Sequence, residues 1–382
     1  MSASRALVVG SGAIGLRTAL ELLRRNVSVI LKSPINPLHP TAAVCSQGAG
    51  GLWMPFHCDD VRVDRWAVDT LDELYPMAQD ESNSLVELVP CVSLKQDHTG
   101  PSMDDFIADN YVKGTGGTSV LPKWTTDARL DFQHLTAEML EWQNLVFDLK
   151  IPTQGTLLHN DYRHAWLFKS PVVDAPAMLK SMLEEVNGHD NTIDLNVETG
   201  HYYKSVEEMV VDAKAMDCDT VINCTGMGAK DLCGDEELVG ARGILLHFDR
   251  ATTQRTYAQG QHDAAIFAED GPWGTETEPC YLIPRGDTLV VGGSYLEGDY
   301  REGMTPEERN RLLDNARILG IDVDASPPIG EWTGFRPSRP STKCEIDDSI
   351  SDVTMVHSYG HGGSGWTVNV GVAKETAKLL NL

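Results

Sequence analysis

The sequence predicts an α/β protein in which a Rossmann-like dinucleotide-binding domain is interleaved with a second domain. The apolar run Ala6–Val9 is followed at once by glycines in GxGxxG spacing. Strand and helix patterns then alternate, give way to a less regular region and return later in the chain. The 382 residues also exceed one domain of roughly 100 to 200 residues, so we expect two connected domains.

Composition narrows the class of protein. Lys and Arg number 31 against 56 Asp and Glu, a net charge of −25, which argues against nucleic acid or an anionic membrane surface as partner. Eight cysteines contain no CxxC pair, so no metal site is expected. No run is long enough to cross a bilayer, and the first strand leaves no room for a signal peptide, so we expect a cytoplasmic protein.

The GxGxxG turn has a steric and an electrostatic logic. Gly10 allows the tight turn, Gly12 lets the backbone approach a pyrophosphate, and Gly15 lets the next helix pack closely on the strand. The helix expected over Ala13–Arg25 then presents its unpaired N–H groups to the phosphates. An ordinary glycine turn is the alternative, but strand, turn and helix patterns all agree here.

The second strand of this unit, Val27–Leu31, ends unusually. An acid that binds the ribose hydroxyls is expected there, whereas this chain has Lys32 and Ser33. A lysine suits a phosphorylated ribose, which keeps a nicotinamide cofactor open. Further on, Gly48–Phe56 passes from glycines into large apolar residues, a pattern typical either of a pocket wall or of a plain loop.

The middle of the chain leaves the nucleotide-binding sheet and returns to it. A helix is expected over Arg62–Tyr75, closed by Pro76, then a strand at Leu85–Leu94 and a surface loop over Gly100–Asp127. We expect the chain to return to the nucleotide-binding sheet through a series of elements, of which the strand Asp219–Gly226 is the last. They also include a helix at Asp174–Val186, a short strand near Asp194–Val197 and a capping box at Ser205–Glu208.

The following region is expected to cross to the second domain again. Glu237–Asp249 carries the crossing, Tyr281–Tyr295 reads as a hairpin around Arg285–Asp287, and Arg250–Pro279 has the length and polarity of a lid. Thr305, Pro306 and Glu308 are capping residues for the helix that follows.

The last fifty residues carry candidate chemistry. Arg336 lies in a proline-stiffened stretch and is suited to clamp a carboxylate, whereas the role of an arginine that bridges the two domains suits Arg339 better. A strand at Val353–Val356 leads into a glycine-rich turn and a helix, which places a second helix N-terminus toward the ligand. His361 in that turn is a candidate general base, although a structural role is the commoner one.

Six segments in order resemble the D-amino-acid oxidase family: GSGAIG, GGLWMPF, INCTG, YLIPRG with VVGGSY, GFRPSRP and YGHGGSGWT. The resemblance implies a noncovalent FAD and a substrate domain of α+β type built on a mixed, largely antiparallel sheet. It implies oxidation of a D-amino acid by hydride transfer to flavin N5, giving a 2-oxo acid, ammonia and, with oxygen, hydrogen peroxide. The expected FAD-binding domain comprises residues 1–60, 155–240 and 325–382, and the substrate domain residues 61–154 and 241–324.

The resemblance also implies roles for individual residues. Arg336 is expected to bind the substrate carboxylate with help from the Tyr281 hydroxyl, and the Gly363 carbonyl to receive the amine. The substrate pocket is expected to include Met54, Phe56 and Thr277. The expected FAD-binding residues are Gly10, Gly12, Ala13, Ile14, Gly15, Ser46, Gly51, Leu52, Tyr203, Thr225, Gly362, Gly363, Gly365, Trp366 and Thr367.

Departures from the family pattern shape the substrate prediction. Thr277 stands where a second tyrosine is usual, so that role is vacant or filled by Tyr257, Phe267 or Trp273. Met54 replaces a glutamine, and no extra arginine for an acidic side chain is evident, which together favour neutral or apolar D-amino acids over D-aspartate. The C-terminus lacks the small-basic-leucine signal, which disfavours the peroxisome.

Three alternatives stay open at this point. One is a related amine oxidase or dehydrogenase acting on glycine or on an N-methylated or cyclic amino acid. Another is a flavin-binding protein without turnover, and the weakest is a nicotinamide dehydrogenase, which only Lys32 supports. A homodimer is compatible with each of them.

Overall fold

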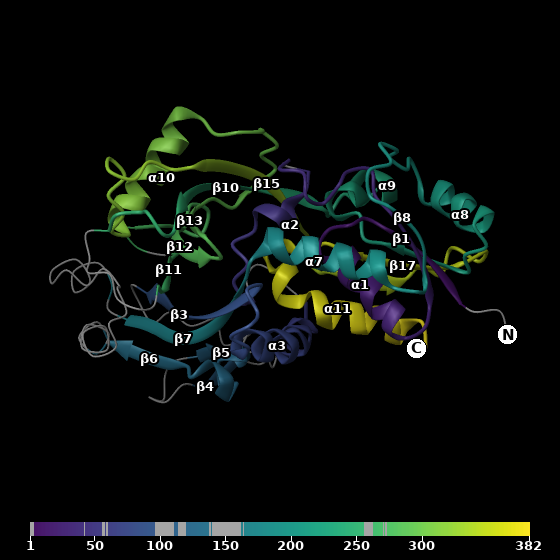
Figure 1. Ribbon diagram of the computed structural model, residues 1–382, viewed down its shortest axis with the longest axis horizontal. Helices are drawn as coiled ribbons and strands as arrows, with labels where there is room; N and C mark the ends of the chain where they lie inside the picture. Colours follow the sequence, from purple (N-terminus) through teal and green to yellow (C-terminus); the bar gives the residue numbers. More distant parts are fainter. Residues whose placement is uncertain are drawn as a thin grey trace.

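The computed structural model describes residues 4–41, 43–55, 58, 60–95, 111–113, 120–136, 139, 162, 164–255, 263–269, 271 and 273–382. Two sheets form the body of the molecule. A smaller sheet with its helices occupies the right of Figure 1, and a larger sheet occupies the left. In the described part of the chain, no helix is both long and apolar enough to cross a membrane.

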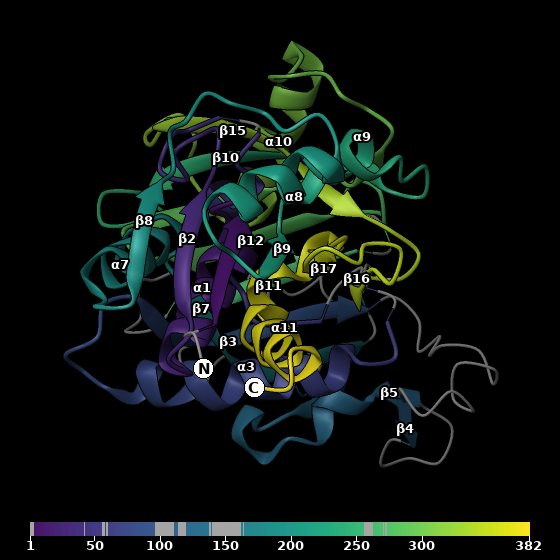
Figure 2. The same cartoon turned by 90° about the vertical axis from the view of Figure 1, so that its right-hand side faces the viewer.

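The smaller sheet has the order β16-β17-β9-β1-β2-β8, and Figure 2 shows β8 beside β2 at one edge. All neighbouring pairs are parallel except β16 with β17. This is the predicted Rossmann-like sheet. Its strands are β1 Arg5–Val9, β2 Ser28–Lys32, β8 Thr192–Asn196, β9 Thr220–Asn223, β16 Lys343–Ile346 and β17 Thr354–Tyr359.

Helices cover both faces of the smaller sheet because alternate residues of each buried strand point to opposite sides. Ala6 and Val8 of β1 pack in the core beneath α1 and α7, whereas Leu7 and Val9 pack in a second core beneath α8. The helices of this part are α1 Ala13–Arg24, α2 Cys45–Gly48, α7 Ala175–Gly188, α8 Val206–Ala215, α9 Ala229–Cys233 and α11 Gly365–Leu379. Helix α3, Val63–Gln79, packs on α11 and on the larger sheet.

The larger sheet has nine strands in the order β14-β10-β13-β12-β11-β3-β7-β6, with β15 paired to β10. Only β11 with β3 is parallel, so the predicted mixed, largely antiparallel sheet is confirmed. Helix α10, Pro306–Ile318, packs Leu312 and Ala316 on it. The strands are β3 Val86–Lys95, β6 Gln133–Thr136, β7 His164–Val173, β10 Val239–Asp249, β11 Ala265–Ala268, β12 Cys280–Arg285, β13 Thr288–Gly292, β14 Leu296–Glu297 and β15 Gly330–Ser338.

Several elements differ from their sequence prediction. Helix α3 continues through Pro76 to Gln79, because a proline removes one hydrogen bond while Trp66 and Leu71 of the same helix are fully buried. The region expected as a loop contains β4 Tyr111–Lys113, β5 Val120–Pro122 and the short 3₁₀ helix Lys123–Thr126. The hairpin of β12 and β13 forms around Gly286 as predicted.

The two sheets also divide the chain differently from the expected domain boundaries. Strands β7 and β15 lie inside the ranges 155–240 and 325–382, yet both hydrogen-bond into the larger sheet. The pairing of β7 with β3 runs over ten residues from Val86 opposite Val173. Such long-range register depends on which strand lies alongside, and this information is absent from the local pattern.

Candidate flavin and substrate site

A cavity of about 550 Å³ lies where the two sheets meet. Its walls are the turns after β1 and β9, the segment from α2 to Met54, the turn before α11, and strands β12 and β15 of the larger sheet. The cavity brings together most of the predicted site residues: Gly10, Gly12, Ala13, Ile14, Ser46, Gly51, Leu52, Met54, Tyr203, Thr225, Tyr281, Arg336, Gly362, Gly363, Gly365 and Trp366.

The turn after β1 has the close packing that its glycines require. Gly10 adopts φ +107°, and a Cβ there would stand 2.3 Å from the Cys224 carbonyl oxygen. A Cβ on Gly15 would stand 1.9 Å from the Gly10 carbonyl oxygen, so Gly15 lies behind the cavity wall. Helix α1 therefore begins at the cavity, and the positive end of its dipole suits a pyrophosphate there.

The first turn of α1 is tied to the glycine-rich turn at the other end of the chain. Ser46 Oγ accepts a hydrogen bond from the Ala13 N–H at 3.1 Å, and Trp366 Nε1 donates to the Ser46 carbonyl at 2.9 Å. Helix α11 begins beside Trp366, so two helix N-termini face one cavity. Both favour negative charge, which suits a dinucleotide and a reduced flavin ring.

The segment after α2 forms the wall between these two helices. Gly51 adopts φ +77°, and a Cβ there would stand 2.0 Å from the Val173 carbonyl oxygen. Thr367 is buried and does not line the cavity; it accepts from the Met54 N–H at 3.2 Å and donates to the Met54 carbonyl at 3.0 Å. Thr367 thereby holds the wall in place from behind.

Arg336 reaches the cavity from β15 of the larger sheet. A Cβ on Gly243 of the neighbouring strand would stand 2.6 Å from Arg336 Nη1, so the guanidinium lies over that glycine. Nη1 donates to the Ser294 carbonyl at 2.8 Å, and the guanidinium lies 5.4 Å from the centre of the Tyr295 ring. Arg336 takes part in none of the ion pairs among the described residues, so no acidic side chain among them competes with a carboxylate for its guanidinium.

Tyr281, which belongs to β12, lies beside Arg336. Burial raises the pKa of its phenol, and the positive charge of Arg336 only partly offsets that effect. The hydroxyl therefore stays protonated at neutral pH and is a hydrogen-bond donor. Phe267 stacks on the Tyr281 ring with centroids 5.7 Å apart and also lines the cavity.

Sequence reasoning missed Tyr295. Its ring lines the cavity beside Arg336, its hydroxyl donates to Ser338 Oγ at 3.1 Å, and burial raises its pKa. Tyr295 ends the VVGGSY segment, but nothing local to that segment indicates that its ring lies beside Arg336. By contrast, Thr277 is exposed on the surface and the structure does not place it in the cavity.

Two of the three candidates for the second aromatic residue lie among the described residues. Phe267 is in the cavity wall, whereas Trp273 is buried away from it against Tyr162, with ring centroids 5.3 Å apart. Phe56 and Tyr257 lie outside the described residues. Phe267 and Tyr295 are therefore the aromatic neighbours that the structure gives to Tyr281 and Arg336.

Lys32 has a partner that the sequence did not reveal. Its ammonium lies 2.9 Å from the Asp212 carboxylate, which also accepts from the Tyr203 hydroxyl. Asp212 comes from α8, so the lysine charge is neutralised within the fold. Ser33, not Lys32, lines the large cavity. This pairing removes the specific support that Lys32 lent to a phosphorylated ribose.

The structure indicates non-catalytic positions for two further candidates. Arg339 forms ion pairs with Asp235 at 3.0 Å and with Glu237, which belong to the same expected domain as Arg339, so these pairs do not bridge the two expected domains. His361 is buried at the cavity wall, and burial lowers its pKa to about 3. An imidazole with that pKa is a very weak base, which favours the structural role. No cluster that could hold a metal ion is present among the described residues.

The fold and the site together define a class of protein. A glycine-lined cavity faced by two helix N-termini fits a flavin dinucleotide, and the free arginine opposite fits a small carboxylate. The chain belongs to the FAD dependent oxidoreductase family, which it matches over residues 5–379. FAD is accordingly its cofactor, and the resemblance to the D-amino-acid oxidase family is confirmed.

Individual relatives lie at a distance. The chain is 26% identical to a D-amino-acid oxidase of Rubrobacter xylanophilus over 98% of its own length and 95% of the relative. It is 24% identical to a D-amino-acid oxidase of Streptomyces coelicolor over 98% and 96%. Among solved structures, glycine oxidase of Bacillus cereus superposes with a TM-score of 0.68 at 15% identity, covering 100% of this chain and 95% of that one.

Proposed function

We propose that this oxidoreductase converts D-amino acids to imino acids, which water hydrolyses to 2-oxo acids and ammonia, while oxygen is reduced to hydrogen peroxide. The observation that carries the proposal is Arg336, a guanidinium without an acidic partner among the described residues, in the wall of the flavin cavity. The curated relatives named D-amino-acid oxidase support the same reaction.

Each residue of the proposed site has a task that follows from its position. Arg336 binds the substrate carboxylate, and the protonated Tyr281 hydroxyl donates a further hydrogen bond to it. The Gly363 carbonyl, at the turn before α11, accepts from the substrate amine. When bound, FAD supplies the two-electron acceptor for the hydride of the substrate Cα. Orientation of the substrate by these contacts is the main contribution of the protein.

The cavity favours neutral or apolar side chains. Met54 and Phe267 contribute apolar surface to the cavity, and the Tyr295 ring lies beside Arg336. Arg336 is the only arginine or lysine among the described residues that line the cavity, so an acidic side chain has no second cation to bind it. Glu269 lies in the same wall and would repel a second carboxylate, although Lys95 lies 3.5 Å from it. D-Aspartate is therefore a poor substrate in this proposal.

The test is the visible spectrum of the purified protein under anaerobic conditions. We expect a flavin absorption band in the blue region of the spectrum. A mixture of neutral D-amino acids should bleach this band, and the L-forms should leave it unchanged. Glycine and N-methylglycine serve as separate additions, because bleaching by these alone would move the proposal to a related amine oxidase. A band that no amine bleaches would indicate a flavin-binding protein without turnover. Oligomeric state and cellular location stay predictions.

A further inference from the structure

The residues that connect β13 to Tyr295 form a short strip of backbone whose carbonyls bind three side chains. We call residues Gly292 to Ser294 the glycine bridge. Its carbonyls accept hydrogen bonds from Asn315 Nδ2 at 3.3 Å, Arg311 Nη2 at 3.0 Å and Arg336 Nη1 at 2.8 Å, in that order along the chain. Two of these donors lie on α10, and the third is the arginine of the site. Helix α10 therefore holds the backbone that orients Arg336.

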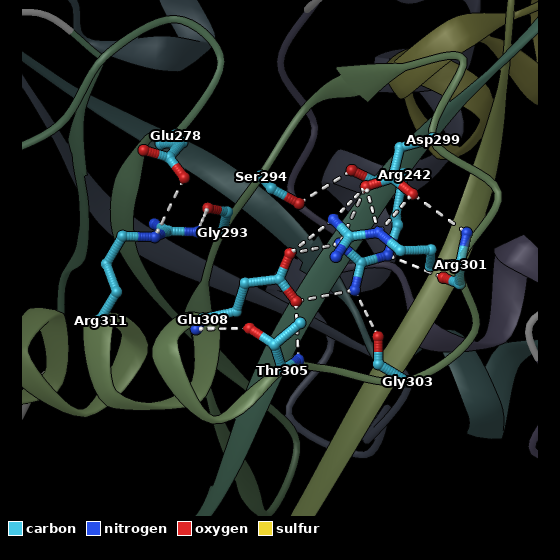
Figure 3. A network of polar contacts seen from close by, with 10 residues as sticks. All are labelled: Arg242, Glu278, Gly293, Ser294, Asp299, Arg301, Gly303, Thr305, Glu308 and Arg311. Carbon is cyan, nitrogen blue, oxygen red and sulfur yellow. Dashed lines mark hydrogen bonds and ion pairs between the residues drawn. The ribbon is translucent and has the colours of Figure 1, made fainter.

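Helix α10 is itself fixed to the sheet beneath the site (Figure 3). Arg242 on β10 is fully buried and donates to both carboxylate oxygens of Glu308 at 2.7 and 2.9 Å. Glu308 also completes the capping box of α10 with Thr305. The carbonyl of Arg242 accepts from Ser294 Oγ at 2.8 Å, so the same residue anchors the helix and the glycine bridge. Arg242, helix α10 and the glycine bridge are therefore each connected to the other two by hydrogen bonds.

The glycine bridge also sets the place of Tyr281. A Cβ on Gly292 would stand 2.3 Å from Tyr281 Cζ, and one on Gly293 would stand 2.7 Å from Tyr281 Cε1. The tyrosine ring thus lies directly on the bridge, and a displacement of the bridge moves Tyr281 and Arg336 together. The Gly293 N–H donates to the Pro279 carbonyl at 2.6 Å, which leaves its own carbonyl to Arg311.

We propose that Arg311 is a positioning residue for carboxylate binding, acting through the glycine bridge on Arg336 and Tyr281. Its side chain is outside the cavity wall, so it does not touch the substrate. One arm binds the Gly293 carbonyl, and Nε lies 3.3 Å from Glu278 on the other side (Figure 3). A cation is suited to this place because a charged donor binds a carbonyl more strongly than a neutral one. The inference rests on the carboxylate role of Arg336 in the proposed function.

The experiment compares Arg311→Met, Arg311→Lys and Arg309→Met with the wild-type protein, all loaded with FAD. Arg309 is the matched control, since it lies on the same helix and pairs with Glu331 at the surface. Calorimetry measures the affinity for benzoate and for benzamide, which carry a carboxylate and a neutral carboxamide, respectively, on the same ring. The flavin spectrum and thermal unfolding report whether each variant is folded and loaded.

We expect the wild-type protein to prefer benzoate to benzamide, and Arg311→Met to lose about tenfold of that preference while it keeps FAD. Arg311→Lys should regain most of the preference, because its ammonium still reaches the Gly293 carbonyl, and Arg309→Met should match the wild type. If Arg311→Met does not fold, Asn315→Leu, which removes the other α10 donor to the glycine bridge, tests whether α10 acts on carboxylate binding through the bridge, and an unchanged preference there would overturn that route.

Three results would overturn the positioning role. They are an unchanged preference in Arg311→Met, equal loss of both ligands, and a wild-type protein without preference for the carboxylate. The proposed function is judged separately by oxidation of D-amino acids by the wild-type protein. Preference for benzoate without oxidation would reject the reaction and keep the carboxylate site, whereas oxidation with an unaltered Arg311→Met would reject the positioning role alone.

Discussion

Replacing Arg336 by alanine is the most direct test of the site. The guanidinium offers a carboxylate two parallel hydrogen bonds, because one further N–H donates to the Ser294 carbonyl at 2.8 Å and no acid among the described residues competes for the others. At about 1.5 to 3 kcal/mol for each charge-assisted bond, their loss costs roughly 3 to 6 kcal/mol. We expect kcat/KM to fall by about 10² to 10⁴.

The assay is steady-state oxidation of neutral D-amino acids, with bound flavin measured on the same samples. Arg336→Ala should keep its yellow colour, because the residues proposed to bind FAD lie at the smaller sheet and at the two helix N-termini. Arg339→Ala is the control, since Arg339 lies three residues away and binds Asp235 and Glu237 instead of the cavity. If Arg336→Ala stays within threefold of wild-type kcat/KM while retaining FAD, the carboxylate role is refuted.

Three other changes test the remaining parts of the argument. Gly10→Ala should abolish FAD binding or folding, because its Cβ would stand 2.3 Å from a backbone oxygen at φ +107°; flavin content of the purified variant checks this. Lys32→Met should leave the affinity for FAD within about threefold of the wild type, and fluorescence titration should detect NADPH binding to neither protein. Tight NADPH binding to the wild type would contradict the conclusion that Lys32 is engaged by Asp212 and does not bind a phosphorylated ribose. Arg242 lowers the pKa of Glu308 from 4.5 to about 2, so the ionised form stabilises the fold above pH 4.5 and that stabilisation is lost as the pH falls toward 2. Acid unfolding of Glu308→Gln should therefore be less steep in that range, and an unaltered profile would show that the pair does not contribute.

The local elements of this protein follow from short stretches of sequence. The turn at Gly10, the hairpin at Gly286 and the capping box at Thr305 each depend on residues within a few positions, and the structure has all three. Two helix N-termini facing one ligand could likewise be expected, because each glycine turn precedes its own helix. The family match extends this reasoning to the cofactor.

The pairing of distant segments could not be predicted in the same way. Lys32 is paired with an acid 180 positions away, β7 joins the larger sheet, and Tyr295 takes a place beside Arg336 that the sequence reasoning had left to the lid. None of these contacts has a local signature. Each depends on which surfaces meet when the two sheets pack.

The sequence by itself determined where the main glycine turns lie, where the helices after them begin and which arginine suits a carboxylate. Only the tertiary structure decided how that arginine is held, because its carbonyl partner, the glycine beneath it and the helix behind it come from three separate parts of the chain. Residues close in the chain meet whatever the fold, whereas those far apart meet only when packing brings their backbones into register.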